Sequence, residues 1–241
     1  MMDFFITYWI MGLIMVPGFI LAIIAESKVF GAYRKYKQVS TSKGQTAAQV
    51  AREILDKNGL YDTAITRVSG EMTDHFDPKN NIVALSEGVH DSTSIAAIGI
   101  ATHEVGHAIQ HAQGYGPAKL RLKLVPIINI SSNLLWPLLL IGVIFNVLAS
   151  TGVWGFVFMW IAIAFFGISV MFSLITLPTE LDASKRALKI LDEGQYLVGD
   201  ELKGAKKVLN AAALTYIASL VNSILTVLRF VLTILVLRNN E

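Results

Sequence analysis

The chain has 241 residues, enough for one or two soluble domains or for a small domain with several membrane helices. Hydrophobic residues make up 54% of it and charged residues only 16%, against about 25% in a typical soluble domain, so the composition indicates a membrane protein. The formal net charge of +2, without a patch of basic and aromatic residues, argues against nucleic-acid binding. Because the chain contains no cysteine, disulfides and thiolate metal ligands are excluded.

Long hydrophobic stretches predict about four transmembrane helices. The first is an uncharged run of 22 residues that follows Asp3 and precedes several lysines and arginines, which is the reverse of a cleaved signal peptide. From Leu124 to Thr179 no residue is charged, and these 56 residues suit two crossings joined by a turn. The predicted spans are residues 4–25, a two-helix hairpin over residues 124–177 that turns at Ser150–Gly152, and residues 208–237.

The last predicted span carries a polar stripe on one helical face. Such a stripe is expected to face other helices rather than lipid. A substrate-cavity lining or an oligomer interface fits the same pattern, so a homo-oligomer is left open. The stripe consists of Thr215, Ser219, Asn222, Thr226, Arg229 and Thr233.

The distribution of lysine and arginine predicts how the chain crosses the bilayer. Residues 26–123 hold 12 of them and residues 178–207 hold six, whereas the turn near Ser150 holds none. Positively charged loops face the cytoplasm, so both polar segments are expected there and both termini outside. The sequence therefore predicts a multi-pass protein of the cell membrane, in contact with the lipid bilayer, with its polar segments on one side.

Residues 26–123 are predicted to form one small domain of helices and short strands. Helical spacing of apolar residues predicts a helix over Thr46–Asn58, and short strands are expected near Thr66–Ser69 and Ile82–Leu85. Ser92, Thr93 and Ser94 offer caps for a second helix that runs to Gln113 and ends at Gly114.

This second helix contains the stretch "ATHEVGHAIQHA". His103 and His107 are four residues apart, so both imidazoles leave one helix face and can reach one zinc ion at about 2.0–2.1 Å. Glu104 points about 100° round the helix axis, which suits a general base for a zinc-bound water. The alternative is a pair of surface histidines on an amphipathic helix.

A catalytic zinc needs a third protein ligand. His111 lies two turns from His103, too far for one helix to wrap three ligands round an ion, so we expect it on the polar face or beside a ligand. The metzincin pattern is excluded, because it requires glycine at the position of Gln110 and histidine at that of Gln113.

Glu180, in "LPTELDASKRALKIL", is the predicted third ligand. Pro178 and Thr179 predict that a helix begins here, with Asp182 completing a capping pair. The two crossings over residues 124–177 return the chain to the cytoplasmic side and bring Glu180 back to the level of the two histidines. The alternative is a glutamate that is favoured at a helix N-terminus by the helix dipole.

Three segments, "DHFDPKNNIVALSEGV", "SIAAIGIATHEVGHAIQH" and "TELDASKRAL", resemble the bacterial YugP-like membrane neutral zinc metallopeptidases over nearly the whole chain. More distantly, the sequence resembles the HtpX-like and CAAX prenyl proteases. The resemblance implies a mainly α, polytopic membrane protein with a small α+β gluzincin-like zinc-protease domain. It also implies one catalytic Zn²⁺ held by His103, His107 and Glu180.

The resemblance is incomplete beside the third ligand. HtpX-like proteins read Glu-Phe-x-Ala-Asp, in which the aspartate orients a ligand histidine, but Ser184 stands at that position here. Ser184, Asp182 or a more distant group is left to support the histidine. The resemblance further implies that Ile82–Ser86, including Ala84, is an edge strand that pairs with an extended substrate.

Two further histidines stay open. His75 and His90 could each stabilise an oxyanion, and the alternative is that both are solvated loop residues.

The expected function is a membrane zinc metalloendopeptidase, with Glu104 as the base, acting on peptide or membrane-protein substrates at the cytoplasmic face. A different class is a catalytically silent membrane scaffold whose structural zinc is closed by a fourth ligand, such as His75, Asp74 or Asp182. A metal transporter is disfavoured, because no histidine or carboxylate lies within a predicted span.

Overall fold

The structure is a computed structural model that describes residues 9–148 and 153–239. The turn predicted at Ser150–Gly152 and the start of the first predicted span lie outside the described residues. The chain divides into two compact units. The first comprises Met1–Ile24, Leu120–Leu177 and Tyr216–Glu241, and the second comprises Ala25–Lys119 and Pro178–Thr215.

Within the described part of the chain, four helices are long and apolar enough to cross a membrane, by length and composition. This confirms the predicted fold class, a mainly α polytopic membrane protein with a small mixed sheet. A short 3-10 helix, η1 (Leu13–Met15), precedes the first of them. The four helices are α2 (Val16–Lys37), α6 (Gly116–Leu148), α7 (Val153–Glu193) and α8 (Asp200–Asn239).

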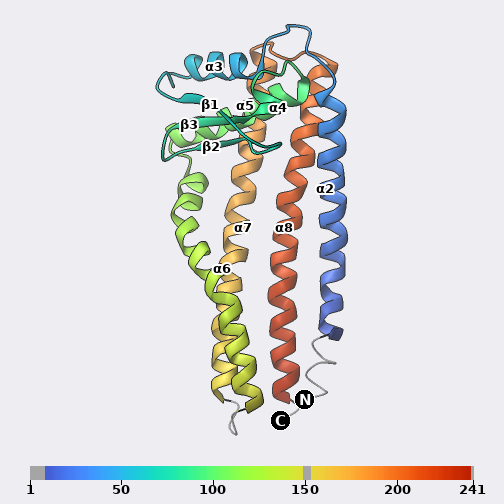
Figure 1. Cartoon of the computed structure of the whole chain (residues 1–241), viewed down its shortest axis with the longest axis vertical. Helices are drawn as coiled ribbons and strands as arrows, with labels where there is room; N and C mark the ends of the chain where they lie inside the picture. Colours follow the sequence, from blue (N-terminus) through green and yellow to red (C-terminus); the bar gives the residue numbers. More distant parts are fainter. Residues whose placement is uncertain (1–8, 149–152, 240–241) are drawn as a thin grey trace. The chain divides into compact units, whose positions relative to one another are not determined.

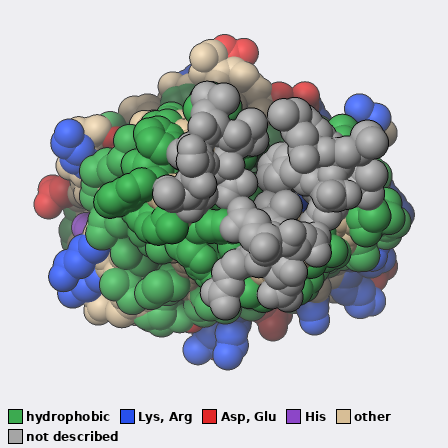
Figure 2. Space-filling view, turned by 90° about the horizontal axis from the view of Figure 1, so that it is seen from below, with side chains coloured by type: hydrophobic (Ala, Val, Ile, Leu, Met, Phe, Trp, Pro, Cys, Tyr) green, Lys and Arg blue, Asp and Glu red, His purple; other side chains and the backbone are tan. Residues whose placement is uncertain are grey.

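Within the first unit the helices pack through two small clusters. Leu135 and Leu139 of α6 meet Ala162 of α7, and Met159 and Ile163 of α7 meet Ile234 of α8. The outward sides are apolar as well, with residues such as Trp136, Leu140 and Trp154 more than half exposed. Figure 2 shows hydrophobic side chains over most of the described surface in that view. An apolar exterior of this extent is what a lipid-facing helix requires.

Part of the polar stripe on α8 faces the first span. The side-chain amide of Asn222 donates a hydrogen bond to the carbonyl oxygen of Gly18 at 3.3 Å, and the hydroxyl of Thr226 lies 3.8 Å from the sulfur of Met15. A Cβ at Gly18 would come within 2.1 Å of Asn222 Oδ1, so glycine allows this close approach. These contacts support helix packing as the role of the stripe.

In the second unit, local signals set the helix ends. The helix α3 (Ala47–Lys57) begins at Thr46, whose hydroxyl accepts from the backbone N–H of Gln49 while the Gln49 side chain accepts from the Thr46 N–H. The helix α5 (Ile95–Ala112) begins at Ser94, whose hydroxyl accepts from Ala97 N–H. Gly59 and Gly114 follow the two helices with φ of +73° and +68°. Both predicted helices are confirmed.

A three-stranded sheet packs against α5 (Figure 1). Its strands are β1 (Ala64–Val68), β2 (His75–Asp77) and β3 (Ile82–Ser86), followed by the short helix α4 (Glu87–His90). The spatial order is β1-β3-β2, with β1 parallel and β2 antiparallel to β3. Buried side chains of β3, including Val83 and Leu85, join those of α3 and α5 in one core.

The expectation that Ile82–Ser86 is an edge strand is wrong. Both sides of β3 are already paired: Ile82 and Ala84 each have a partner on β1 and another on β2. A strand in this position has no free row of backbone groups to offer a substrate, so Ile82 and Ala84 do not bind one by strand addition.

The expectation that a helix begins at Pro178 and Thr179 is also wrong. The helix α7 runs without interruption from Val153 to Glu193, with Pro178 inside it. A proline within a helix removes one backbone donor, and helices tolerate this where the surrounding structure satisfies the freed carbonyl. Glu180 therefore lies inside a long helix rather than at a helix N-terminus.

Candidate metal centre

The helix α5 presents two imidazoles from adjacent turns. His103 and His107 are four residues apart, and their ring centroids lie 4.7 Å from each other in an edge-to-face arrangement. Both side chains are mostly buried, with 14% and 15% of their surface exposed. Glu104 follows His103 and is 9% exposed. The helix therefore holds all three motif residues in a sheltered position.

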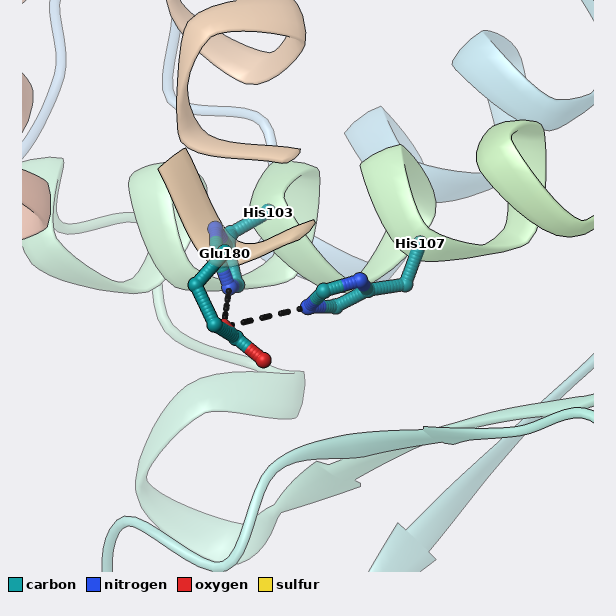
Figure 3. A group of neighbouring side chains, drawn as sticks. All are labelled: His103, His107 and Glu180. Atoms are coloured by element: carbon teal, nitrogen blue, oxygen red, sulfur yellow. Dashed lines mark hydrogen bonds and ion pairs between the residues drawn. The ribbon is translucent and has the colours of Figure 1, made fainter. Parts of the chain in front are cut away.

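The carboxylate of Glu180 lies between the two rings (Figure 3). Its Oε2 atom is 3.2 Å from Nε2 of His103 and 3.4 Å from Nε2 of His107. Glu180 is 2% exposed and comes from α7, so α5 and α7 together build the group. Among the described residues, His103, His107 and Glu180 are the one set of three or more metal-binding side chains close enough to share an ion.

The two helices approach closely because the motif contains a glycine. A Cβ added to Gly106 would lie 2.9 Å from the carbonyl oxygen of Ala183 on α7, closer than such atoms ordinarily come. Ala183 is itself fully buried and small. This pair of small residues lets Glu180, three residues before Ala183, reach the histidines of α5.

Each of the two histidines has a partner at its other ring nitrogen. The hydroxyl of Ser184 lies 3.1 Å from Nδ1 of His103, and Oε1 of Gln110 lies 3.0 Å from Nδ1 of His107. Asp182 is not the partner of either imidazole in these two hydrogen bonds. Its carboxylate instead accepts a hydrogen bond from the side-chain amide of Gln110 at 2.8 Å. Ser184 and Asp182 are thus both beside the centre, one directly and one through Gln110.

The donor set suits zinc. Tetrahedral ligands at 2.0–2.1 Å from an ion are separated by about 3.3 Å, which matches the 3.2 and 3.4 Å between Glu180 and the two imidazoles. Two imidazoles and one carboxylate are a ligand set of catalytic zinc enzymes. Burial lowers the pKa of His107, but the hydrogen bond to Glu180 and the charges of Glu104 and Glu180 outweigh it, so that this pKa is raised overall. The same negative surroundings favour a bound cation.

The remaining candidate residues lie outside this group. His111 is exposed and packs against the ring of Phe76 on β2, with 5.8 Å between ring centroids. His75 lies with Nδ1 2.9 Å from the carbonyl oxygen of Thr73. His90 is paired with Asp91 at 2.8 Å.

Asp74, the other candidate for a fourth ligand, is held by Ser86. Its carboxylate accepts hydrogen bonds from the backbone N–H of Ser86 at 2.7 Å and from the Ser86 hydroxyl at 3.0 Å.

The contact of Gln110 with the centre is absent from the sequence-based expectations, where this residue served to exclude the metzincins. Its position carries a signal nevertheless, since a residue three places after His107 lies on the same face of α5. The pattern does not show that α7 supplies Thr179 and Asp182 as hydrogen-bond acceptors for the NH₂ group of the Gln110 side chain.

Comparisons of the sequence with known proteins find both a matching family and a curated relative. The model of a family described as "Putative neutral zinc metallopeptidase" matches residues 11–235. The "Putative membrane protease YugP" of Bacillus subtilis is 44% identical over 215 residues, which cover 89% of this chain and 92% of that protein. No solved structure gives a significant match.

Proposed function

We propose that this chain, which belongs to the family described as "Putative neutral zinc metallopeptidase", is a membrane zinc endopeptidase whose active site faces the cytoplasm. Its membership of this family confirms the YugP-like resemblance. The observation that carries the proposal is the convergence of three side chains from two helices. Nε2 of His103 and Nε2 of His107 both lie within 3.4 Å of one carboxylate oxygen of Glu180.

In this proposal His103, His107 and Glu180 hold one Zn²⁺. When bound there, the ion would supply Lewis-acid chemistry: it would lower the pKa of a water molecule toward about 7 and would polarise the scissile carbonyl. Glu104 acts as the general base: its carboxylate takes a proton from the attacking water and gives it to the leaving amine. Its position next to His103 in the sequence and its low exposure support this role.

A catalytic site is supported over a closed structural one. A structural zinc has four protein ligands, and the candidates for the fourth were His75, Asp74 and Asp182. Asp74 bonds to Ser86, Asp182 bonds to Gln110, and His75 bonds to the Thr73 carbonyl. None of the three joins the ligand group, so a fourth position is left for water or substrate.

If substrates bind as an added strand, we propose β2 as the strand that receives them. One edge of β2 pairs with β3, and no described strand pairs with its other edge. Phe76 in the middle of β2 contacts His111, one turn beyond His107 on α5. An extended substrate on this edge would run beside the helix that carries the metal ligands, and strand addition would read its backbone rather than its sequence.

The cytoplasmic orientation rests on charge. The lysines and arginines lie overwhelmingly in residues 26–123 and 178–207, which contain both halves of the metal centre. Cytoplasmic peptides and unfolded segments of membrane proteins are therefore the proposed substrates, with the lipid bilayer as the surroundings of the four apolar helices.

Metal analysis of the detergent-purified protein, together with hydrolysis of casein or a labelled peptide, tests the proposal. The parent should contain one zinc per chain and cleave the substrate. Glu104→Gln should keep the zinc and lose about 10²–10⁴-fold in hydrolysis, since it lacks the base. Glu193→Gln, at a 68% exposed side chain on α7, is the matched control and should behave as the parent does. Parental hydrolysis by Glu104→Gln would refute the base assignment.

A further inference from the structure

We propose that Gln110 is the positioning residue of the metal centre: its amide holds His107 in the tautomer that leaves Nε2 free for zinc, and it ties this ligand to the turn of α7 that carries Glu180. The inference rests on the proposed zinc site. It adds a residue that no sequence motif marks, and it explains how two ligands from separate helices are set by one side chain.

The contacts of Gln110 use its whole amide. The residue has no exposed surface, although it carries a polar side chain. Its Oε1 lies 3.0 Å from Nδ1 of His107, and its Nε2 lies 2.9 Å from the carbonyl oxygen of Thr179 and 2.8 Å from Oδ2 of Asp182. Two N–H donors and one acceptor are thereby satisfied, as a buried amide requires.

The chemistry of the partners fixes the direction of every bond. A backbone carbonyl and a carboxylate can only accept, so the amide NH₂ must face Thr179 and Asp182. The amide oxygen must then face His107 and can only accept, so Nδ1 of His107 carries the hydrogen. The neutral ring consequently presents an unprotonated Nε2, which is the atom 3.4 Å from Glu180.

The acceptors on α7 flank the third ligand in the sequence. Thr179 precedes Glu180, and Asp182 follows it by two positions. The Gln110 amide therefore donates hydrogen bonds to residues on both sides of Glu180 in the same turn of α7. Asp182 is held in turn by the guanidinium of Arg186, one helical turn further on. A shift of α7 relative to α5 would therefore have two effects at once. It would break these hydrogen bonds, and it would move Glu180 away from His107.

The other histidine lacks such a constraint. The hydroxyl of Ser184 beside Nδ1 of His103 can either donate or accept, so it does not by itself select a tautomer. We therefore expect changes at Gln110 to lower the metal affinity more than changes at Ser184 do.

The test compares Gln110→Met with Gln113→Met, at the residue that caps the C-terminus of the same helix. Methionine is close to glutamine in size and removes only the polar amide. Gln113 is exposed and also links α5 to α7, by accepting from Nη1 of Arg186 at 2.6 Å, but it touches no ligand. Zinc affinity is measured by chelator competition, and the ligand arrangement by the visible absorption of the Co²⁺-substituted protein.

We expect Gln110→Met to bind zinc about 10–100-fold more weakly and to shift the Co²⁺ bands, because the loss of an outer hydrogen-bond partner has effects of this size. Gln113→Met should keep the parental affinity and spectrum. A folded Gln110→Met protein with both parental properties would overturn the proposal.

Asp182→Ala provides a second route, because this side chain is 26% exposed and its removal leaves the core intact. It should weaken zinc binding without touching an imidazole, and its effect should not add to that of Gln110→Met, since both act through one relay. Parental affinity in Asp182→Ala, or full additivity, would also overturn the proposal. These measurements need no hydrolysis, so a parent that binds zinc but cleaves nothing would refute the proposed function and leave the positioning role standing.

Discussion

The Oε2 atom of Glu180 lies 3.2 Å from Nε2 of His103, although 77 positions separate the two residues in the chain. The approach depends on α7 continuing past Pro178 and on the small pair Gly106 and Ala183 at the crossing with α5. A metal centre built across two helices couples the packing of the helices to metal affinity.

Removing the third ligand should abolish tight zinc binding. In Glu180→Ala only the two neutral imidazoles remain as ligands. Changing a residue that merely hydrogen-bonds to a ligand lowers metal affinity by about 10–100-fold, and we expect a larger loss here. Chelator competition on the purified protein measures this, with Glu193→Ala as a control on the exposed side of α7. Unchanged zinc content in Glu180→Ala would remove this residue from the site.

A methyl group at Gly106 should push the two helices apart. The substitution Gly106→Ala gains about 1 kcal/mol in helix propensity but places a Cβ 2.9 Å from a backbone oxygen, and overpacking of this kind costs about 1–3 kcal/mol. We expect a net loss of thermal stability in detergent and weaker zinc binding.

Gly99→Ala is the control for this prediction, since its Cβ would lie 3.4 Å from the methyl of Ala205, near ordinary contact. It should keep or raise the melting temperature and retain zinc affinity. Equal behaviour of the two variants would show that the crossing of α5 and α7 does not need a glycine.

Asp74 should give the stability a pH dependence of definite sign. Burial raises the pKa of this carboxyl, and the hydrogen bonds from Ser86 offset the shift only in part. A group whose pKa is raised in the folded state binds more protons there, so its contribution is present below the unfolded pKa of about 3.9 and is lost as pH rises through the folded pKa. The melting temperature of the parent should therefore fall relative to that of Asp74→Asn as the pH rises from 4. A difference in melting temperature between the two proteins that stays constant with pH would contradict this.

Zinc should stabilise the folded protein by binding to it preferentially. At a free concentration of 100 times the dissociation constant the gain is about 2.7 kcal/mol. We expect zinc to raise the melting temperature of chelator-treated parent protein and to leave that of Glu180→Ala unchanged. Magnesium, which prefers oxygen ligands, is the control ion and should have no effect on either protein. A shift of equal size in the variant would place the stabilising ion elsewhere.

The sequence was informative where the signal is local. Thr46 and Ser94 are recognisable caps, Gly59 and Gly114 stop their helices, and four-residue spacing puts His103 and His107 on one face. The pairing of strands is not local, because β3 lies in the sheet between two strands that both precede it in the sequence, and its central place could not be read from Ile82–Ser86 alone.

Pro178 shows a second limit of local signals. A proline after a hydrophobic run commonly marks the start of a helix, yet here α7 continues through it. Gln110 shows a third, since its burial in a polar network depends on acceptors about 70 residues away on another helix.

The most direct test is X-ray absorption at the zinc edge of the purified, zinc-loaded protein, beside Glu180→Ala. We predict two imidazole rings and a carboxylate oxygen around zinc at about 2.0–2.1 Å in the parent, and loss of this zinc signal in the variant. A site with three or more imidazoles, or a spectrum that Glu180→Ala leaves unchanged, would contradict the assignment of His103, His107 and Glu180.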